Sequence, residues 1–179
     1  SSCRARNEQF TLFKPCTITM REKVPLFVAR QRFKHTVGFS YNEVSRRYVD
    51  DLPEFYVPTE WRKKADDRKQ GSSEETIDIN PHHLMIDDYL QSINKAKWTY
   101  IHLLGMDVCP EQARMVLPQS TYTEYYVTGS LYAWARAYNL RSESTAQQEI
   151  QDLASQWHDI IIKLFPESWI SLITNLKGG

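Results

Sequence analysis

The residues best suited to bind an anion are concentrated in one segment, residues 30–48, with the sequence RQRFKHTVGFSYNEVSRRY. This segment gathers five cations around a single carboxylate, Glu43, although the chain of 179 residues has a formal net charge of zero. Guanidinium forks match phosphate oxygens and a lysine adds a point charge, so the segment predicts a phosphate site. The five cations are Arg30, Arg32, Lys34, Arg46 and Arg47.

Glu43 has two interpretations that composition leaves open. A carboxylate accepts hydrogen bonds, so Glu43 can bind ribose hydroxyls, and phosphate together with ribose means a nucleotide. Equally, Glu43 can form an ion pair that offsets Arg46 or Arg47.

A second set of arginines lies further along the chain, within apolar helical stretches: Arg114, Arg136 and Arg141. Each is costly to bury without an anionic partner, or else extends its stem over apolar neighbours at the surface. Taken with Asn42, Ser45, Tyr48 and Asn139 as neutral hydrogen-bonding groups, the set favours a phosphate-bearing ligand over surface arginines.

Composition excludes several other classes. GxGxxG, GxxxxGK[ST], GxSxG and HExxH are all missing from the sequence, and no apolar run is long enough to cross a bilayer. Net neutrality argues against a general nucleic-acid binder. The odd cysteine count without CxxC favours a reducing, cytoplasmic protein without a metal site. Adjacent His82 and His83 do not share a helix face, and His102 and His158 are expected to be structural.

The first elements expected to position these residues are short. Residues 17–24 are β-branched and extended, and Pro25 suits the first turn of a helix that continues to about Lys34. Residues 46–58 are expected to be irregular or extended, and the charge-rich residues 59–80 to form a polar, solvated loop. A long helix follows from Pro81 to Gly105, because its apolar residues recur at helical spacing.

The second half of the chain is also rich in helices. A short helix is expected over 110–117, a strand over 121–128 and a helix over 130–141. Ser144 and Gln147 are typical of a capping box. They predict the start of an amphipathic helix with apolar residues from Ile150 to Leu164, and a last helix covers about 167–176. This order predicts an α+β, helix-rich single domain over residues 1–179 rather than a regular βαβ alternation.

The cationic segment, residues 30–48, resembles the signature of the flavin-dependent thymidylate synthases. This signature is an R-Q-aromatic-aromatic-R-H-R run that leads into N-E-x-S-x-R-Y. A second motif agrees, since residues 113–150 resemble that family's A-R-x-x-L-P, L-R and A-Q-x-E-I. The resemblance covers roughly residues 9–155.

The resemblance implies reductive methylation of dUMP to dTMP, with methylenetetrahydrofolate as carbon donor and FAD, reduced by NADPH, as hydride donor. It also implies a helix-rich fold with a small antiparallel sheet, and a homotetramer with shared active sites. Neither nucleic acid nor a membrane is an expected partner. The chain starts SSCRARNEQF, and much of the family's N-terminal region is expected to be truncated or outside this sequence.

Site residues are carried over position by position. Arg141 matches the catalytic arginine thought to favour ionisation of the pyrimidine, and Glu43 matches a residue that touches both nucleotides. The dUMP set is Gln31, Arg32, Phe33, Lys34, Glu43, Val44, Ser45, Arg46, Arg47, Arg114 and Arg141. The FAD set is Thr11, Lys34, His35, Thr36, Glu43, Ser130, Leu131, Tyr132 and Arg136.

The sequence departs from the family pattern at two places. Lys34-His35-Thr36 replaces R-H-R, and one extra residue near Phe39 separates this triplet from Ser45. These departures concern the flavin side and raise a second hypothesis, an inactive nucleotide-binding relative. A third hypothesis is a single-stranded nucleic-acid binding module, in which Phe33, Phe39, Tyr41 and Tyr48 would stack on bases.

Overall fold

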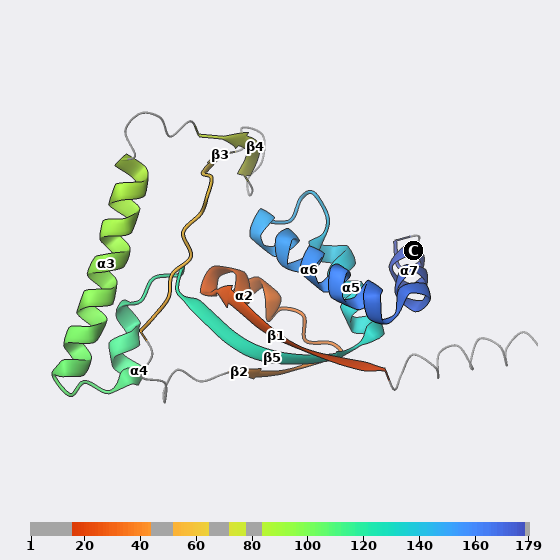
Figure 1. Cartoon of the computed structure of the whole chain (residues 1–179), viewed down its shortest axis with the longest axis horizontal. Coiled ribbons are helices and arrows are strands. Elements are labelled where there is room, and N and C mark those ends of the chain that lie inside the picture. Colours follow the sequence, from red (N-terminus) through yellow and green to blue (C-terminus); the bar gives the residue numbers. More distant parts are fainter. Residues whose placement is uncertain (1–15, 44–51, 65–71, 78–83, 178–179) are drawn as a thin grey trace, which may run out of the picture. The chain divides into compact units, whose positions relative to one another are not determined.

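The computed structural model describes residues 16–43, 52–64, 72–77 and 84–177, and Figure 1 labels its helices and strands. The strands are β1 (Thr17–Pro25), β2 (Phe39–Glu43), β3 (Arg62–Lys64), β4 (Ser72–Thr76) and β5 (Tyr122–Ser130). The helices are α2 (Leu26–Arg32), α3 (Leu84–Gly105), α4 (Pro110–Ala113), the 3-10 turn η2 (Arg114–Val116), α5 (Leu131–Arg141), α6 (Gln148–Leu164) and α7 (Pro166–Asn175). The helix-rich α+β prediction is confirmed.

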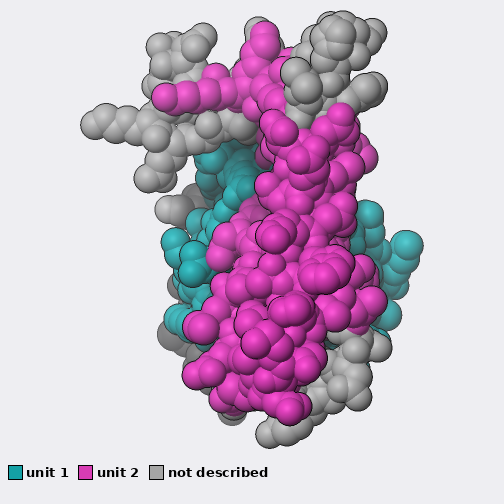
Figure 2. Space-filling view, turned by 90° about the vertical axis from the view of Figure 1, so that its left-hand side faces the viewer, with its two compact units in different colours: residues 1–22, 30–43, 125–179 teal, residues 23–29, 44–124 magenta. Residues whose placement is uncertain are grey.

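Two compact units make up the chain, and Figure 2 colours them separately. Unit 1 contains residues 1–22, 30–43 and 125–179, and unit 2 contains residues 23–29 and 44–124. The single-domain organisation stays a prediction. Among the described residues, none of the helices combines the length and the apolar character needed to cross a membrane.

The three-stranded sheet has β5 in the centre, between β1 and β2. β1 alternates buried and exposed residues as a strand with one covered face does, and the chain turns into α2 directly after Pro25. β2 pairs antiparallel with β5, with Phe39 opposite Gly129 and Glu43 opposite Tyr125. Gly129 is required there, because a Cβ at this position would lie 2.5 Å from the Phe39 ring.

The core of unit 1 forms where α5, α6 and α7 pack on one another. Trp134, Trp157 and Trp169 are fully buried. The Asn139 amide of α5 donates to the carbonyl oxygen of Ile173 of α7 at 2.9 Å. The predicted stripe on α6 is confirmed from Ile150 to Ile161, whereas Leu164 is exposed.

The predicted capping box is wrong. α6 begins after Gln147, which occupies the N-cap position in an extended conformation and forms no side-chain cap hydrogen bond. The sequence pattern S-x-x-Q was therefore placed three residues too early. The Gln147 side chain contacts Gln31 instead.

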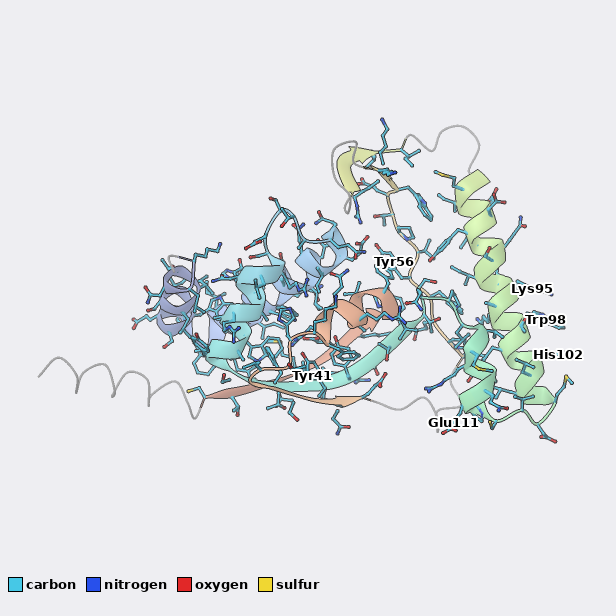
Figure 3. All side chains as sticks on the ribbon, turned by 180° about the vertical axis from the view of Figure 1, so that it is seen from behind. Tyr41, Tyr56, Lys95, Trp98, His102 and Glu111 are labelled. Carbon is cyan, nitrogen blue, oxygen red and sulfur yellow. The ribbon has the colours of Figure 1, made fainter. Side chains whose placement is uncertain are left out.

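Unit 2 contains the long helix α3, on which α4 and η2 pack. Ile93 and Tyr100 are the buried residues of α3, and its outer side carries Trp98 and His102, whose rings stack with centroids 5.9 Å apart (Figure 3). The helix expected over 110–117 is a single turn, α4, followed by the tighter η2.

The polar stretch 59–80 does not consist only of loop. β3 and β4 pair antiparallel within it, with Arg62 opposite Thr76. The Ile77 amide also donates to the carbonyl oxygen of Trp61. Backbone pairing at an irregular register stabilises this hairpin, so hydrophobic periodicity gave no sign of it.

Candidate functional site

The centre of the candidate site is a hydrogen-bonded group in unit 1, formed by the end of α2, the turn after it and the last residue of α5. Arg141 Nε donates to His35 Nε2 at 2.8 Å, and Arg141 Nη2 donates to the backbone carbonyl of Gln31 at 3.2 Å. The Gln31 side-chain amide in turn donates to Gln147 Oε1. Gln31 and His35 of the first motif thus both contact Arg141 of the second motif, although more than 100 residues separate each of them from Arg141.

His35 lies in a positive electrostatic field. Burial is the largest cause that lowers its pKa to about 4, and the charges of Arg141, Arg32 and Arg136 lower it further. Burial, followed by the charge of Arg32, also lowers the pKa of Arg141. A half-buried place where three guanidinium groups raise the potential is suited to an anionic ligand.

Arg32 requires a correction to the prediction that it binds dUMP. Its guanidinium is fully buried, and its Nε pairs with Glu22 Oε2 at 3.1 Å. Arg32 Nη1 donates to the Tyr41 hydroxyl at 2.6 Å, and Cζ lies over the rings of Phe39 and Trp157 at 4.5 and 4.6 Å. Its charge is therefore paired inside the core, and Arg32 acts on the site through its electrostatic field and through the Tyr41 hydroxyl.

Tyr41 connects this buried arginine to the site. Its hydroxyl donates to the backbone carbonyl of His35 at 2.6 Å while it accepts from Arg32. Burial raises the pKa of Tyr41 to about 12, so the hydroxyl keeps its proton. The position of the His35 backbone is fixed in this way from the core side.

The remaining residues of the turn are placed differently. Phe33 is half-buried, with its ring 4.8 Å from that of Tyr125, and so contributes to the core. Lys34 and Thr36 are exposed. Glu43 is the exposed last residue of β2 and has further contacts of its own.

Four of the positions predicted to contact FAD lie at the end of β5 and in α5. Ser130 is the N-cap of α5, and its hydroxyl accepts from the Ala133 amide at 3.1 Å. Leu131 is buried, so its side chain belongs to the core. Tyr132 and Arg136 are exposed one helical turn apart, on the same side of α5.

The three arginines of the second predicted set differ in exposure. Arg114, in unit 2, is exposed on η2, rather than buried in an apolar stretch. Arg136 is likewise exposed, while Arg141 is half-buried. Several predicted residues lie outside the described residues, namely Thr11, Val44, Ser45, Arg46, Arg47, Tyr48 and the His82–His83 pair.

Sequence reasoning missed Glu22, Tyr125 and the role of Gln147. The Tyr125 hydroxyl donates to Glu22 Oε2 at 2.6 Å. A signal for Glu22 was present, because alternation along residues 17–25 puts it on the same face as Met20 and Val24. An acid on the apolar face of a strand predicts a buried cationic partner.

The described histidines and cysteines do not form a cluster with one another or with acidic residues. In the described ranges, three or more potential ligand side chains do not come together anywhere. His158 Nδ1 accepts from Trp169 Nε1 at 2.9 Å, a structural role, as expected. Cys16 and Cys109 form no disulfide with each other.

Comparison with known proteins decides the family. A family model described as thymidylate synthase complementing protein, Thy1, matches residues 3–167. A flavin-dependent thymidylate synthase of Thermosipho africanus is 40% identical over 178 residues, which cover 94% of this chain and 76% of that protein. This chain belongs to the flavin-dependent thymidylate synthase family.

Other members of the flavin-dependent thymidylate synthase family agree. The protein of Thermus thermophilus is 33% identical over 174 residues, and the match covers 97% of this chain but 63% of that protein. Among solved structures, a UMP/dUMP methylase, PolB, from Streptomyces cacaoi bound with 5-Br dUMP has a TM-score of 0.72 and 28% identity. That match covers 84% of this chain and 67% of PolB. The chain thus spans roughly two thirds to three quarters of the length of these relatives.

Proposed function

We propose that this protein catalyses reductive methylation of dUMP to dTMP, with methylenetetrahydrofolate and NADPH as co-substrates. The observation that carries the proposal is the contact of Arg141 with His35 and Gln31, in a field raised by Arg32 and Arg136. The family name supports the reaction, and the structural similarity to a methylase of uridine nucleotides supports the substrate.

In this proposal Arg141 is the catalytic residue. A guanidinium stays protonated and cannot act as an ordinary base. It stabilises negative charge that develops on the pyrimidine ring, which makes the ring carbon a better nucleophile. Arg47 and Ser45 would bind the phosphate, as the family motif implies, with Arg46 and Val44 in the same loop.

The residues around α5 fit a bound FAD in part. Exposed Arg136 and Lys34 supply cations, and the positive end of the α5 dipole lies beside Ser130 and Tyr132. The Ser130 hydroxyl is occupied as a helix cap, and the side chain of Leu131 is buried, so only the backbone of Leu131 is available to the cofactor. When bound, FAD would supply the hydride, while these residues hold and orient it.

Three further statements belong to the proposal. We infer a homotetramer that shares its active sites, as the resemblance to the family implies. We also infer a cytoplasmic location, from the odd cysteine count without a CxxC pair. Finally, we keep the single-domain organisation, because β1 and β5 each contribute residues to both units.

The nucleic-acid alternative is not favoured. Phe33, Phe39 and Tyr41, which a single-strand binder would use for stacking, contact each other. Phe39 also contacts Trp134 in the core. Half-buried rings that pack against one another are poor platforms for successive bases.

An absorption spectrum with and without dUMP tests the proposal. We expect a yellow protein whose flavin bands shift when dUMP is added, and dUMP-dependent oxidation of NADPH when the folate is present. UMP should be run in parallel, because PolB is described as acting on both nucleotides. A protein that binds no flavin after reconstitution contradicts the proposal, and dUMP binding without turnover would identify the inactive relative.

A further inference from the structure

Arg141 uses the Nε and Nη2 atoms of its guanidinium for its hydrogen bonds to His35 and Gln31. Arginine has five N–H donors, and two of these are engaged, by His35 Nε2 and by the carbonyl oxygen of Gln31. As far as the described part of the chain goes, three donors therefore remain for a ligand. Because both engaged donors are held by residues of one short segment, the guanidinium plane cannot rotate without breaking both hydrogen bonds.

We propose that His35 is a positioning residue for Arg141, whose ring nitrogen Nε2 holds the guanidinium in one orientation for a bound pyrimidine nucleotide. The inference rests on the proposed function for its ligand, while the contact itself belongs to the free protein. The family resemblance assigns His35 to the flavin, so this role towards Arg141 is an addition.

The protonation state of His35 is set by its surroundings. Nε2 accepts a hydrogen bond only in the neutral ring, with the proton on Nδ1. Burial and the charges of Arg141, Arg32 and Arg136 lower the pKa of His35 to about 4, so the ring is neutral at physiological pH. Protonation would place two cations 2.8 Å apart and remove the acceptor, which would release Arg141.

Both ends of the contact are anchored in the fold. On the His35 side, Tyr41 donates to the His35 carbonyl at 2.6 Å. On the Gln31 side, the Gln147 side chain accepts from the Gln31 amide at the start of α6. The acceptors that orient Arg141 are therefore held by strand β2 and helix α6, rather than by the ligand.

Two variants of His35 separate positioning from simple structural support. His35→Gln keeps an acceptor near the place of Nε2 but does not titrate, whereas His35→Phe keeps a ring and removes the acceptor. Dissociation constants for dUMP are measured by calorimetry on the full chain at pH 7.5 and pH 5. Thermal unfolding and circular dichroism confirm that each variant folds.

At pH 7.5 we expect His35→Gln to bind dUMP within about threefold of the wild type, and His35→Phe to bind at least tenfold more weakly. A further measurement at pH 4, where about half of the His35 rings are protonated, should lower the affinity ratio of wild type to His35→Gln about twofold. Titration of the dUMP phosphate cancels in this ratio. Equal affinity of His35→Phe and the wild type would overturn the proposal, as would the same ratio at pH 4 and pH 7.5.

A second measurement needs no ligand. The ring nitrogens of His35 are titrated by NMR in the wild type and in Arg141→Ala. We expect the pKa of His35 to lie near 4 in the wild type and to rise in Arg141→Ala. A pKa near 6.5 in both proteins would show that the contact is absent. This result does not depend on dUMP binding, so it tests the contact separately from the proposed function.

Discussion

The guanidinium of Arg32 and the carboxylate of Glu22 form an ion pair at 3.1 Å in the core of unit 1, where both side chains are almost free of solvent. Tyr125 donates to the same carboxylate, and Tyr41 accepts from Arg32. Burial raises the pKa of Glu22, and the charge of Arg32 opposes this shift. Since Tyr41 also binds the His35 backbone, the pair supports the turn that presents the candidate site.

Removing one partner of this pair should destabilise the fold strongly. Arg32→Met or Glu22→Leu leaves the other partner uncompensated in the core, with an expected loss of about 3–5 kcal/mol in the free energy of unfolding. The double variant Arg32→Met with Glu22→Leu should lose less than the sum of the single losses. Urea unfolding measures all three, and additive losses would show that the two residues are not coupled.

Gly38 should be difficult to replace. It has a φ of 79°, and a Cβ there would lie 2.9 Å from the Cβ of Ala133. Gly38→Ala should therefore cost about 1–3 kcal/mol. Gly105→Ala is the matched control, because a Cβ at Gly105 meets nothing within 4 Å. This control should be neutral or stabilising by up to about 1 kcal/mol, and equal losses in both variants would contradict the account.

Acid should weaken the fold through His35. Above pH 6.5 the ring is neutral in both states, whereas between 6.5 and about 4 only the unfolded chain binds the proton. The free energy of unfolding should therefore fall as the pH falls through this window, by about 1–2 kcal/mol after allowing for partial solvent screening. His35→Gln should lack this component, so the difference between the two unfolding curves measures it. A constant difference from pH 7 to 4 would be inconsistent with a lowered pKa.

The sequence predicted most helices, because their apolar residues follow helical spacing. It named Gln31, His35 and Arg141 as candidate site residues, because they lie in the two family motifs, but it did not predict that Arg141 contacts the other two. It did not predict that Arg32 is buried, because its pairing with Glu22 and its contacts with Trp134 and Trp157 depend on long-range packing.

Other failures have local causes. β3 and β4 have charged, polar sequences without alternation, so their pairing leaves no periodic signal. The side chain of Gln147 pairs with Gln31 across 116 residues, while local rules placed it in a capping box. In both cases a contact outside the local window decided the structure.

Arg141→Lys should keep the fold but reduce turnover severely, by about a hundredfold or more. An ammonium cannot donate to both His35 and Gln31 in the plane of the lost fork and still face the pyrimidine. Arg30→Lys, an exposed change on α2, is the control and should be close to wild type. Steady-state rates of dTMP formation measure both, and near-normal turnover of Arg141→Lys would remove Arg141 from the mechanism.

Product analysis tests the central claim most directly. Purified protein is incubated with FAD, NADPH, methylenetetrahydrofolate and dUMP, and the nucleotides are separated and identified by mass. We predict a product heavier than dUMP by one CH2 group, identified as dTMP, which forms only when all components are present. Unchanged dUMP, from a protein that has bound its flavin, would contradict the proposed reaction.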